Sequence, residues 1–330
     1  MTSKFSSKII VAIFLAIFFI FYFLGVYWSF EPDQLNIRTE VTQDAKADGV
    51  NPVVGYTTTT ALIRVTETLL NKPGGYLSND ALPPSVFLDN IPAWELGALE
   101  MSRDMALVMR QEFSRSQSQS VENNHLKVAQ PQYNIDHKSW AMPSTESEYN
   151  KAVNELYAYR KALTEVNSQS AQFYARSDNL QDWIQEVTKR LGSYSQRLSA
   201  SVGREQLNTD LAGDSEAQQS TYTQSSVVLK TSWWKIDDEF YEARGACWAL
   251  LHFLRAVEID FNDVLEKKNA KVSVQQIIRE LEASQESIWS PMILNGDGFG
   301  LLANHSLVMA NYISRANAAL IDLNDLLSQG

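Results

Sequence analysis

One predicted helix near the C-terminal end carries the side chains with the greatest potential for chemistry. Residues 246–257 are apolar except for His252 and Arg255. With 3.6 residues per helical turn, one narrow strip of this helix has small side chains in its middle and acidic side chains at its ends. The strip comprises Asp238, Glu242, Gly245, Ala249, His252, Ala256, Asp260 and Asp263. His252 and the flanking carboxylates could therefore line a polar cavity of an enzyme or of a small-ligand binder.

A structural role for the same strip is the alternative, and we favour it. The small residues Gly245, Ala249 and Ala256 permit close approach of a second helix, while the acids can pair with Arg244, Arg255 or basic residues elsewhere. Buried ionisable groups are costly unless they are paired. Structural ion pairs meet that demand more often than active sites do.

Other chemistries lack their motifs. A carboxylate-bridged di-metal bundle needs Glu-x-x-His pairs on two helices, and the chain does not have two such pairs. Its four His residues and single Cys are scattered, so we expect no metal and no cofactor. Without a Gly-x-Ser-x-Gly or Walker pattern we expect no catalytic residue, and the glycine cluster at 295–300 is typical of a tight turn.

Charge and cysteine content limit the partners. The net charge is −11, from 28 basic and 39 acidic residues, which argues against a nucleic-acid partner. The only cysteine, Cys247, lies within the apolar stretch, where a thiol is usually an inert small hydrophobe.

The N-terminal segment predicts a membrane anchor. Residues 9–30 carry no charge, and as a helix these 22 residues would be roughly 33 Å long, enough to cross a bilayer. Lys4 and Lys8 precede the run and no acid occurs before Glu31, so residues 1–8 are expected in the cytoplasm. The run is too long, and its end too bulky, for a cleaved signal peptide.

Helical periodicity dominates the rest of the chain. We predict a spacer over 31–55 and one helical domain over 56–330, which could divide into packed halves at 56–202 and 226–330. The fold class is therefore all-α, with one transmembrane helix followed by a multi-helix bundle with long irregular connections. Those connections are expected at 114–143, with Trp140 as a packing anchor, and at 203–225.

Local signals mark several helices. Thr145 and Glu148 predict a capping box that opens a helix running to about residue 175. A stripe with alternating spacings of four and three follows, and it comprises Leu180, Ile184, Val187, Leu191, Tyr194 and Leu198. This stripe could pack inside the bundle or hold two copies of the chain together. Asn304 is expected to cap the last helix.

Several phrases resemble one family of Gram-negative bacteria, catalogued as domain of unknown function 2333. They are GGYLSND (74–80), LDNIPAWE (88–95), WAMPSTESEY (140–149), KRLGSYSQRLSA (189–200), IDDEFYEARG (236–245), SPMILNG (290–296) and ANHSLVMA (303–310). The resemblance covers essentially the whole chain. It implies a single-pass envelope protein of the inner membrane, and it implies nothing about catalysis.

These phrases direct attention to one group of polar residues. Asp237, Asp238, Glu242 and Arg244 lie in one phrase, and Asn304 and His305 lie in another. We expect the two segments to pack together and, with His252, Arg255 and Asp260, to form a polar core cluster whose role is structural.

The sequence favours a protein without catalytic activity that is anchored in the bacterial inner membrane by residues 9–30. Its C-terminal domain would lie in the periplasm and act as a scaffold or adaptor for other envelope proteins. The alternatives are an enzyme or small-ligand binder that acts on cell-wall or lipid material through acids near Asp238 and Glu242, and a self-assembling coiled-coil protein.

Overall fold

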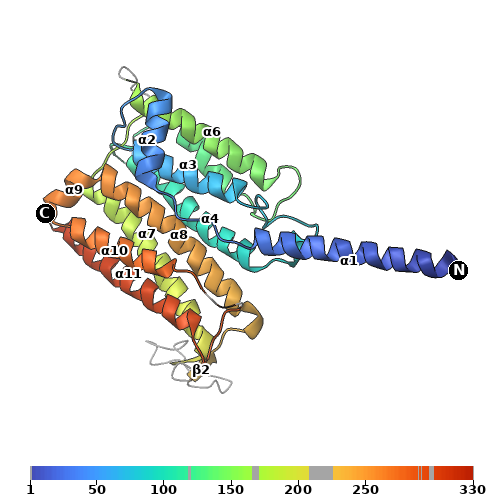
Figure 1. Cartoon of the computed structure of the whole chain (residues 1–330). Coiled ribbons are helices and arrows are strands. Elements are labelled where there is room, and N and C mark those ends of the chain that lie inside the picture. Colours follow the sequence, from blue (N-terminus) through green and yellow to red (C-terminus); the bar gives the residue numbers. More distant parts are fainter. Residues whose placement is uncertain are drawn as a thin grey trace, which may run out of the picture.

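A computed structural model of the chain describes residues 2–117, 120–165, 171–207, 226–288, 290, 292–296 and 301–329. One long helix, α1, projects from a helical body, and the C-terminus lies at the other end of that body (Figure 1). The α-helices of the described residues are α1 (Thr2–Trp28), α2 (Ile37–Asp48), α3 (Tyr56–Asn71), α4 (Asn90–Val108), α5 (Asn124–Tyr133), α6 (Thr145–Thr164), α7 (Ser177–Ser199), α8 (Ile236–Asp260), α9 (Asn262–Lys267), α10 (Lys271–Ser284) and α11 (His305–Ser328). The predicted all-α class is confirmed.

Shorter elements join these helices. They are the 3-10 turns η1 (Ser85–Phe87), η3 (Ala200–Val202) and η4 (Trp233–Lys235), the π-helical turn η2 (Met109–Phe113), and the strands β1 (Arg204–Leu207) and β2 (Ser226–Leu229). The two strands pair antiparallel, with Arg204 opposite Leu229. Most of the loop predicted at 203–225 lies outside the described residues.

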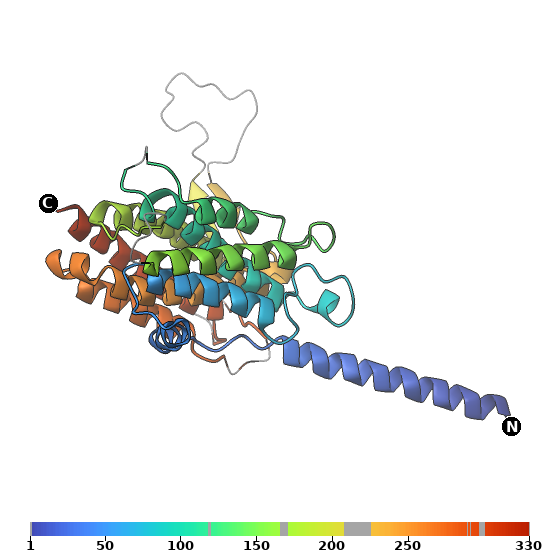
Figure 2. The ribbon, with the colours of Figure 1, turned by 90° about the horizontal axis from the view of Figure 1, so that it is seen from above.

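Helix α8 lies in the middle of three layers. Helices α2, α3, α5 and α6 form one outer layer, α4 and α8 the middle layer, and α7, α10 and α11 the other outer layer (Figures 1 and 2). Every side chain of α8 from Ala243 to Leu254 is buried, as expected for a helix that is apolar on nearly all sides. Helices of both predicted halves contact α8, so the two halves share one core.

The stripe of α7 is part of that core. All six of its side chains are buried inside the chain's own bundle, where α7 packs against α11 and α4. The packing role is therefore confirmed. In the structure this face is covered by the same chain.

Helix α1 contains one segment that could cross a membrane by its length and composition. The segment Ser7–Trp28 has a mean hydropathy of 3.0, and almost none of its surface is buried in the chain. Its last turns contact the body, since Gly25 packs against Pro84 and Leu88, and the Trp28 ring packs on Gly74. Gly74 has a φ of +85° and a Cβ there would lie 2.8 Å from that ring, so glycine is required.

Two predicted connections contain helices. The expected loose spacer at 31–55 holds α2, whose Ile37, Val41 and Ala45 are buried against the body. The expected connection at 114–143 holds α5, which packs on α6. Both helices are short and rich in polar residues, so their apolar periodicity was too weak to predict them from the sequence. Trp140 is 73% exposed, so its predicted role as a packing anchor is wrong.

The ends of α6 also differ from the prediction. Ser144, not Thr145, is the N-cap and accepts a hydrogen bond from the Ser147 N–H. The buried Thr145 hydroxyl instead donates to the carbonyl oxygens of Asp136 and Ser139. The helix ends at Thr164 rather than near 175, and beyond it the Tyr174 N–H bonds to the carbonyl oxygen of Phe113 on another helix.

Candidate functional site

Three of the predicted site residues bind the segment that follows α1. Residues 31–36, which we call the strap, cross the surface of α8 between α1 and α2. Arg244, His252 and Arg255 of α8 all form hydrogen bonds with the strap. The polar groups of the apolar helix therefore hold the chain just beyond α1.

His252 binds the backbone of the strap. Its Nε2 accepts the Leu35 N–H at 2.7 Å, and its Nδ1 donates to the carbonyl oxygen of Trp248 at 2.6 Å. The ring is fully buried, and this burial lowers the pKa of His252 to about 3. His252 is therefore neutral at physiological pH and acts as a fixed hydrogen-bond acceptor, not as an acid or a base.

Arg244 joins the strap to the end of α10. Its Nε lies 2.7 Å from both carboxylate oxygens of Glu31. Its two terminal nitrogens donate to the carbonyl oxygens of Ser284 and Gln285, at 2.9 and 3.2 Å. A guanidinium at a helix C-terminus satisfies free carbonyls and complements the helix dipole.

Arg255 and Trp248 complete the contact with the strap. Arg255 donates to the Leu35 carbonyl oxygen, to the Gln34 side chain and to Glu282. The indole N–H of Trp248 donates to the carbonyl oxygen of Asp33 at 3.2 Å. The strap is thus hydrogen-bonded to α8 at four of its six positions.

Asp260 has a different role, at the far end of α8. Helix α3 begins after Gly55, which has no side chain to cap it. Asp260 supplies the cap, because its carboxylate accepts the N–H and the hydroxyl of Thr58, each at 2.7 Å. A carboxylate is favourable at a helix N-terminus.

The acids at the start of α8 do not converge on His252. Glu242 accepts hydrogen bonds from Arg197 of α7, and Arg197 also pairs with Glu239 at 2.9 Å. Asp237 and Asp238 lie in the first turn of α8, where the helix dipole favours negative charge. Burial, and then the charge of Asp237, raises the pKa of Asp238.

Asn304 and His305 shape the turn before α11. The Asn304 side chain accepts the Leu307 N–H at 2.8 Å, so the predicted N-cap is confirmed, and it also donates to the carbonyl oxygen of Gly296. His305 Nδ1 accepts the Leu294 N–H at 2.8 Å. Part of the predicted glycine turn, 297–300, lies outside the described residues.

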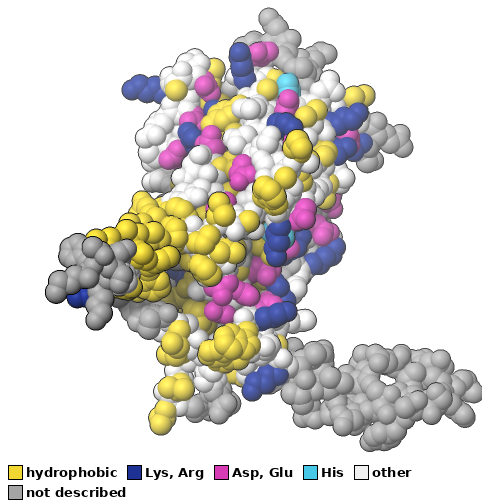
Figure 3. Space-filling view, turned by 90° about the vertical axis from the view of Figure 1, so that its right-hand side faces the viewer, with side chains coloured by type: hydrophobic (Ala, Val, Ile, Leu, Met, Phe, Trp, Pro, Cys, Tyr) yellow, Lys and Arg dark blue, Asp and Glu magenta, His cyan; other side chains and the backbone are white. Residues whose placement is uncertain are grey.

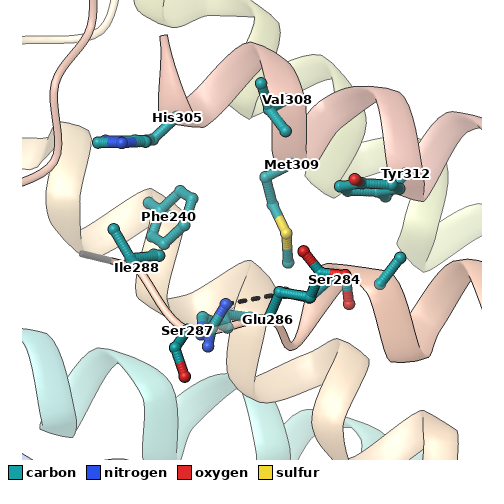
Figure 4. A pocket seen from close by; sticks show the side chains of 11 residues that line it. Phe240, Ser284, Glu286, Ser287, Ile288, His305, Val308, Met309 and Tyr312 are labelled. Carbon is teal, nitrogen blue, oxygen red and sulfur yellow. Dashed lines mark hydrogen bonds between the residues drawn. The ribbon is translucent and has the colours of Figure 1, made fainter. Parts of the chain in front are cut away.

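A pocket lies where the phrase at the start of α8 and the phrase at the start of α11 meet (Figure 4). It has a volume of about 240 Å³, and its lining includes Phe240, Arg244, Ile288, His305, Met309 and Tyr312. The rings of Phe240 and His305 are 6.5 Å apart. The two segments therefore meet mainly through apolar side chains, and the lining includes neither Asp238 nor Glu242, so the nine predicted residues do not form one polar centre.

Two buried ion pairs that lie in the N-terminal half of the body were not predicted from the sequence. Lys72 and Glu95 lie 2.5 Å apart, with their side chains 1% and 0% exposed. Arg160 pairs with Asp44 and lies over the ring of Tyr56. Lys72 follows a helix end next to Pro73, so only the three-dimensional contact reveals its role.

Metal and thiol chemistry have no support in the part of the chain that is described. There, no group of three His, Cys, Asp or Glu side chains is placed to hold a metal ion. Cys247 is buried, and burial raises the pKa of its thiol to about 12. The thiol is therefore protonated and unreactive at neutral pH.

The neutral state of His252 predicts a specific acid sensitivity. Its folded pKa lies below its unfolded value of 6.5, so the unfolded chain binds the proton more readily and stability falls as the pH decreases from about 6.5 toward 3. We expect the loss to be on the order of 1 kcal/mol per pH unit in this range. Urea unfolding of the wild-type chain and of His252→Gln at pH 7 and pH 5.5 measures it. Equal losses in both proteins would contradict the assignment.

The comparisons with known proteins agree with the resemblance seen in the sequence. A family model described as an uncharacterised protein conserved in bacteria, DUF2333, matches residues 2–330. No curated protein and no solved structure matches the chain. The chain belongs to this bacterial family, domain of unknown function 2333.

Proposed function

We propose that this protein is a single-pass scaffold or adaptor of the bacterial inner membrane, with α1 as an uncleaved anchor and the helical body in the periplasm. Lys4 and Lys8 before the apolar run support a cytoplasmic N-terminus. Other envelope proteins would be its partners, and the bilayer its site of attachment.

The strap is the observation that carries this proposal. A flexible linker would be enough to tether an independent domain, but Glu31, Asp33, Gln34 and Leu35 are all bonded to α8. The body is therefore held in one orientation relative to α1. A body held in a fixed orientation and at a fixed distance from the membrane suits a protein that presents one surface to neighbouring proteins in the same membrane.

The alternative functions have less support. An acidic site near Asp238 and Glu242 would need a free, desolvated carboxylate in a cavity, but Glu242 is paired with Arg197. A coiled coil through the α7 stripe would need that stripe on the surface, and it is buried.

The topology is tested with one cysteine on the surface. Ser328 is exposed near the C-terminus, whereas the natural Cys247 is buried and its thiol is protonated. In intact spheroplasts, Ser328→Cys should react with a membrane-impermeant maleimide, and the wild-type chain should not. The intact mass of the purified protein should include α1.

Two results would contradict the proposed topology. One is labelling of Ser328→Cys only after the inner membrane is permeabilised. The other is a mature chain that begins after Trp28, which would make α1 a signal sequence. The scaffold role is tested separately, by cross-linking in living cells followed by mass spectrometry. Failure to recover a protein partner under several growth conditions would count against it.

A further inference from the structure

The loop before α4 is apolar, uncharged and exposed. Between Asp80 and Asp89 the sequence is ALPPSVFL, residues 81–88, which we call the apolar loop. Leu82 and Phe87 are each 76% exposed, and Val86 is 51% exposed. A soluble surface rarely presents three large apolar side chains on one short uncharged segment, so the exposure calls for an environment other than water.

The apolar loop lies beside α1 and not beyond its end. Its Pro84, Phe87 and Leu88 line an apolar groove together with Phe18, Phe21 and Tyr22 of α1, with a volume of about 310 Å³. Figure 3 shows the hydrophobic side chains of α1 continuing onto the adjoining surface of the body. The loop and the anchor therefore form one continuous apolar surface.

The rise per residue of an α-helix gives the depth in the membrane at which the loop lies beside α1. Phe18 lies ten residues before Trp28, the end of the span Ser7–Trp28, and this corresponds to about 15 Å along the helix. The whole span is only about 33 Å long, close to the hydrocarbon thickness of a bilayer. If α1 spans the membrane, side chains that contact Phe18, Phe21 and Tyr22 lie at the level of one leaflet.

The backbone of the apolar loop suits that environment. Pro83 and Pro84 have no N–H, and the N–H groups of Val86, Phe87 and Leu88 donate to carbonyl oxygens of the same loop. The Ser85 hydroxyl also donates within it, to Leu82. Internal hydrogen bonding is what backbone groups need where water is scarce.

We propose that residues 81–88 insert into the leaflet of the bilayer on the body's side, beside α1, and form a second membrane contact. The occupant of this surface is thus lipid acyl chain. The inference rests on the proposed membrane-spanning role of α1. It adds a second point of attachment, which with α1 would prevent the body from turning about the axis of the anchor.

The test uses the full chain in phosphatidylcholine vesicles. Variants with one added cysteine, Phe87→Cys, Leu15→Cys and Val272→Cys, are labelled with an environment-sensitive fluorophore before reconstitution, and lipids brominated on their acyl chains serve as quenchers. The natural Cys247 is buried and is not expected to react. Leu15 lies in α1 and reports on the anchor. Val272 is a matched control, because it is 75% exposed like Phe87 but lies at the first turn of α10, at the end of the body away from α1 (Figure 1).

We expect the label at Phe87 to be blue-shifted and quenched about as strongly as the label at Leu15, and the label at Val272 to be neither. If Leu15 is quenched but Phe87 is not, the apolar loop is outside the bilayer and this inference is wrong, while the anchor stands. If Leu15 is not quenched either, the proposed membrane-spanning role fails first.

Two further measurements separate the remaining outcomes. A disulfide between two unlabelled Phe87→Cys chains in the vesicles, together with no lipid quenching of the labelled variant, would show that a second copy covers the loop and would overturn the inference. Leu82→Cys provides an independent second position in the loop. It should give the same blue shift and quenching as Phe87→Cys, because Leu82 is equally exposed.

Discussion

A single methyl group added at Gly245 is expected to lower the free energy of unfolding by about 3 kcal/mol. Gly245 of α8 faces α4, and a Cβ there would lie 1.9 Å from the carbonyl oxygen of Trp94. The obstacle is backbone, so no side chain can rotate away. The two helices would have to separate, which would loosen the contact between the buried rings of Trp94 and Trp248, now 5.0 Å apart.

The same loss of stability is expected when a methyl group is added to a glycine of the opposite helix, α4. A Cβ on Gly97 of α4 would lie 1.8 Å from the carbonyl oxygen of Glu242. In an ordinary helix, glycine to alanine is stabilising by up to about 1 kcal/mol, so the expected sign is reversed at both positions.

Gly192→Ala is the matched control. Gly192 is inside α7, and its Cβ would meet only an Asn317 side-chain atom at 3.9 Å, an ordinary contact. Urea unfolding of the full chain in detergent should show Gly192→Ala unchanged or slightly more stable, and Gly245→Ala and Gly97→Ala less stable. Equal effects at the three sites would refute the close crossing of α4 and α8.

Removal of the Glu95 carboxylate is expected to lower the free energy of unfolding by about 3–5 kcal/mol, because it leaves the Lys72 charge buried without its partner. Glu95 also accepts the N–H groups of Leu77 and Ser78, each at 2.8 Å, and the Ser78 hydroxyl. Glu95→Ala therefore removes a charge partner and leaves two N–H donors unpaired, of which that of Leu77 is buried.

Two further variants identify the cause of the stability loss expected for Glu95→Ala. The exposed pair Glu186–Lys189 has side chains 54% and 69% exposed, and Glu186→Ala should change stability by less than about 1 kcal/mol. Lys72→Met combined with Glu95→Ala should be less destabilising than the sum of the two single changes. If the double variant shows strict additivity, the buried pair is not an energetic unit.

Residue spacing within single elements was sufficient to predict much of the fold. The apolar run of α8, the α7 stripe and the Asn304 cap follow from spacing within one element, and each is present. The small size of Gly245 also predicted a close helix crossing, and its Cβ geometry confirms that α4 approaches there.

Partners across the fold could not be predicted. The ring of His252 meets the N–H of Leu35, 217 positions away, and no periodicity links them. The sequence suggested that His252 lay with carboxylates because they share a helix strip. In the structure those carboxylates pair with groups on other elements, such as Arg197 and Thr58. Residue type predicted that each buried polar group needs a partner, but not which one.

The position of α8 late in the chain has a consequence for biosynthesis. The ribosome makes α1, the strap, α3 and α4 first, yet the helix against which they pack begins only at Ile236. Until that stretch emerges, the faces of α3 and α4 that pack on α8 are uncovered and the N–H of Leu35 lacks its imidazole acceptor. The contacts of the early helices and of the strap with α8 can therefore form only after Ile236 has been made, late in synthesis.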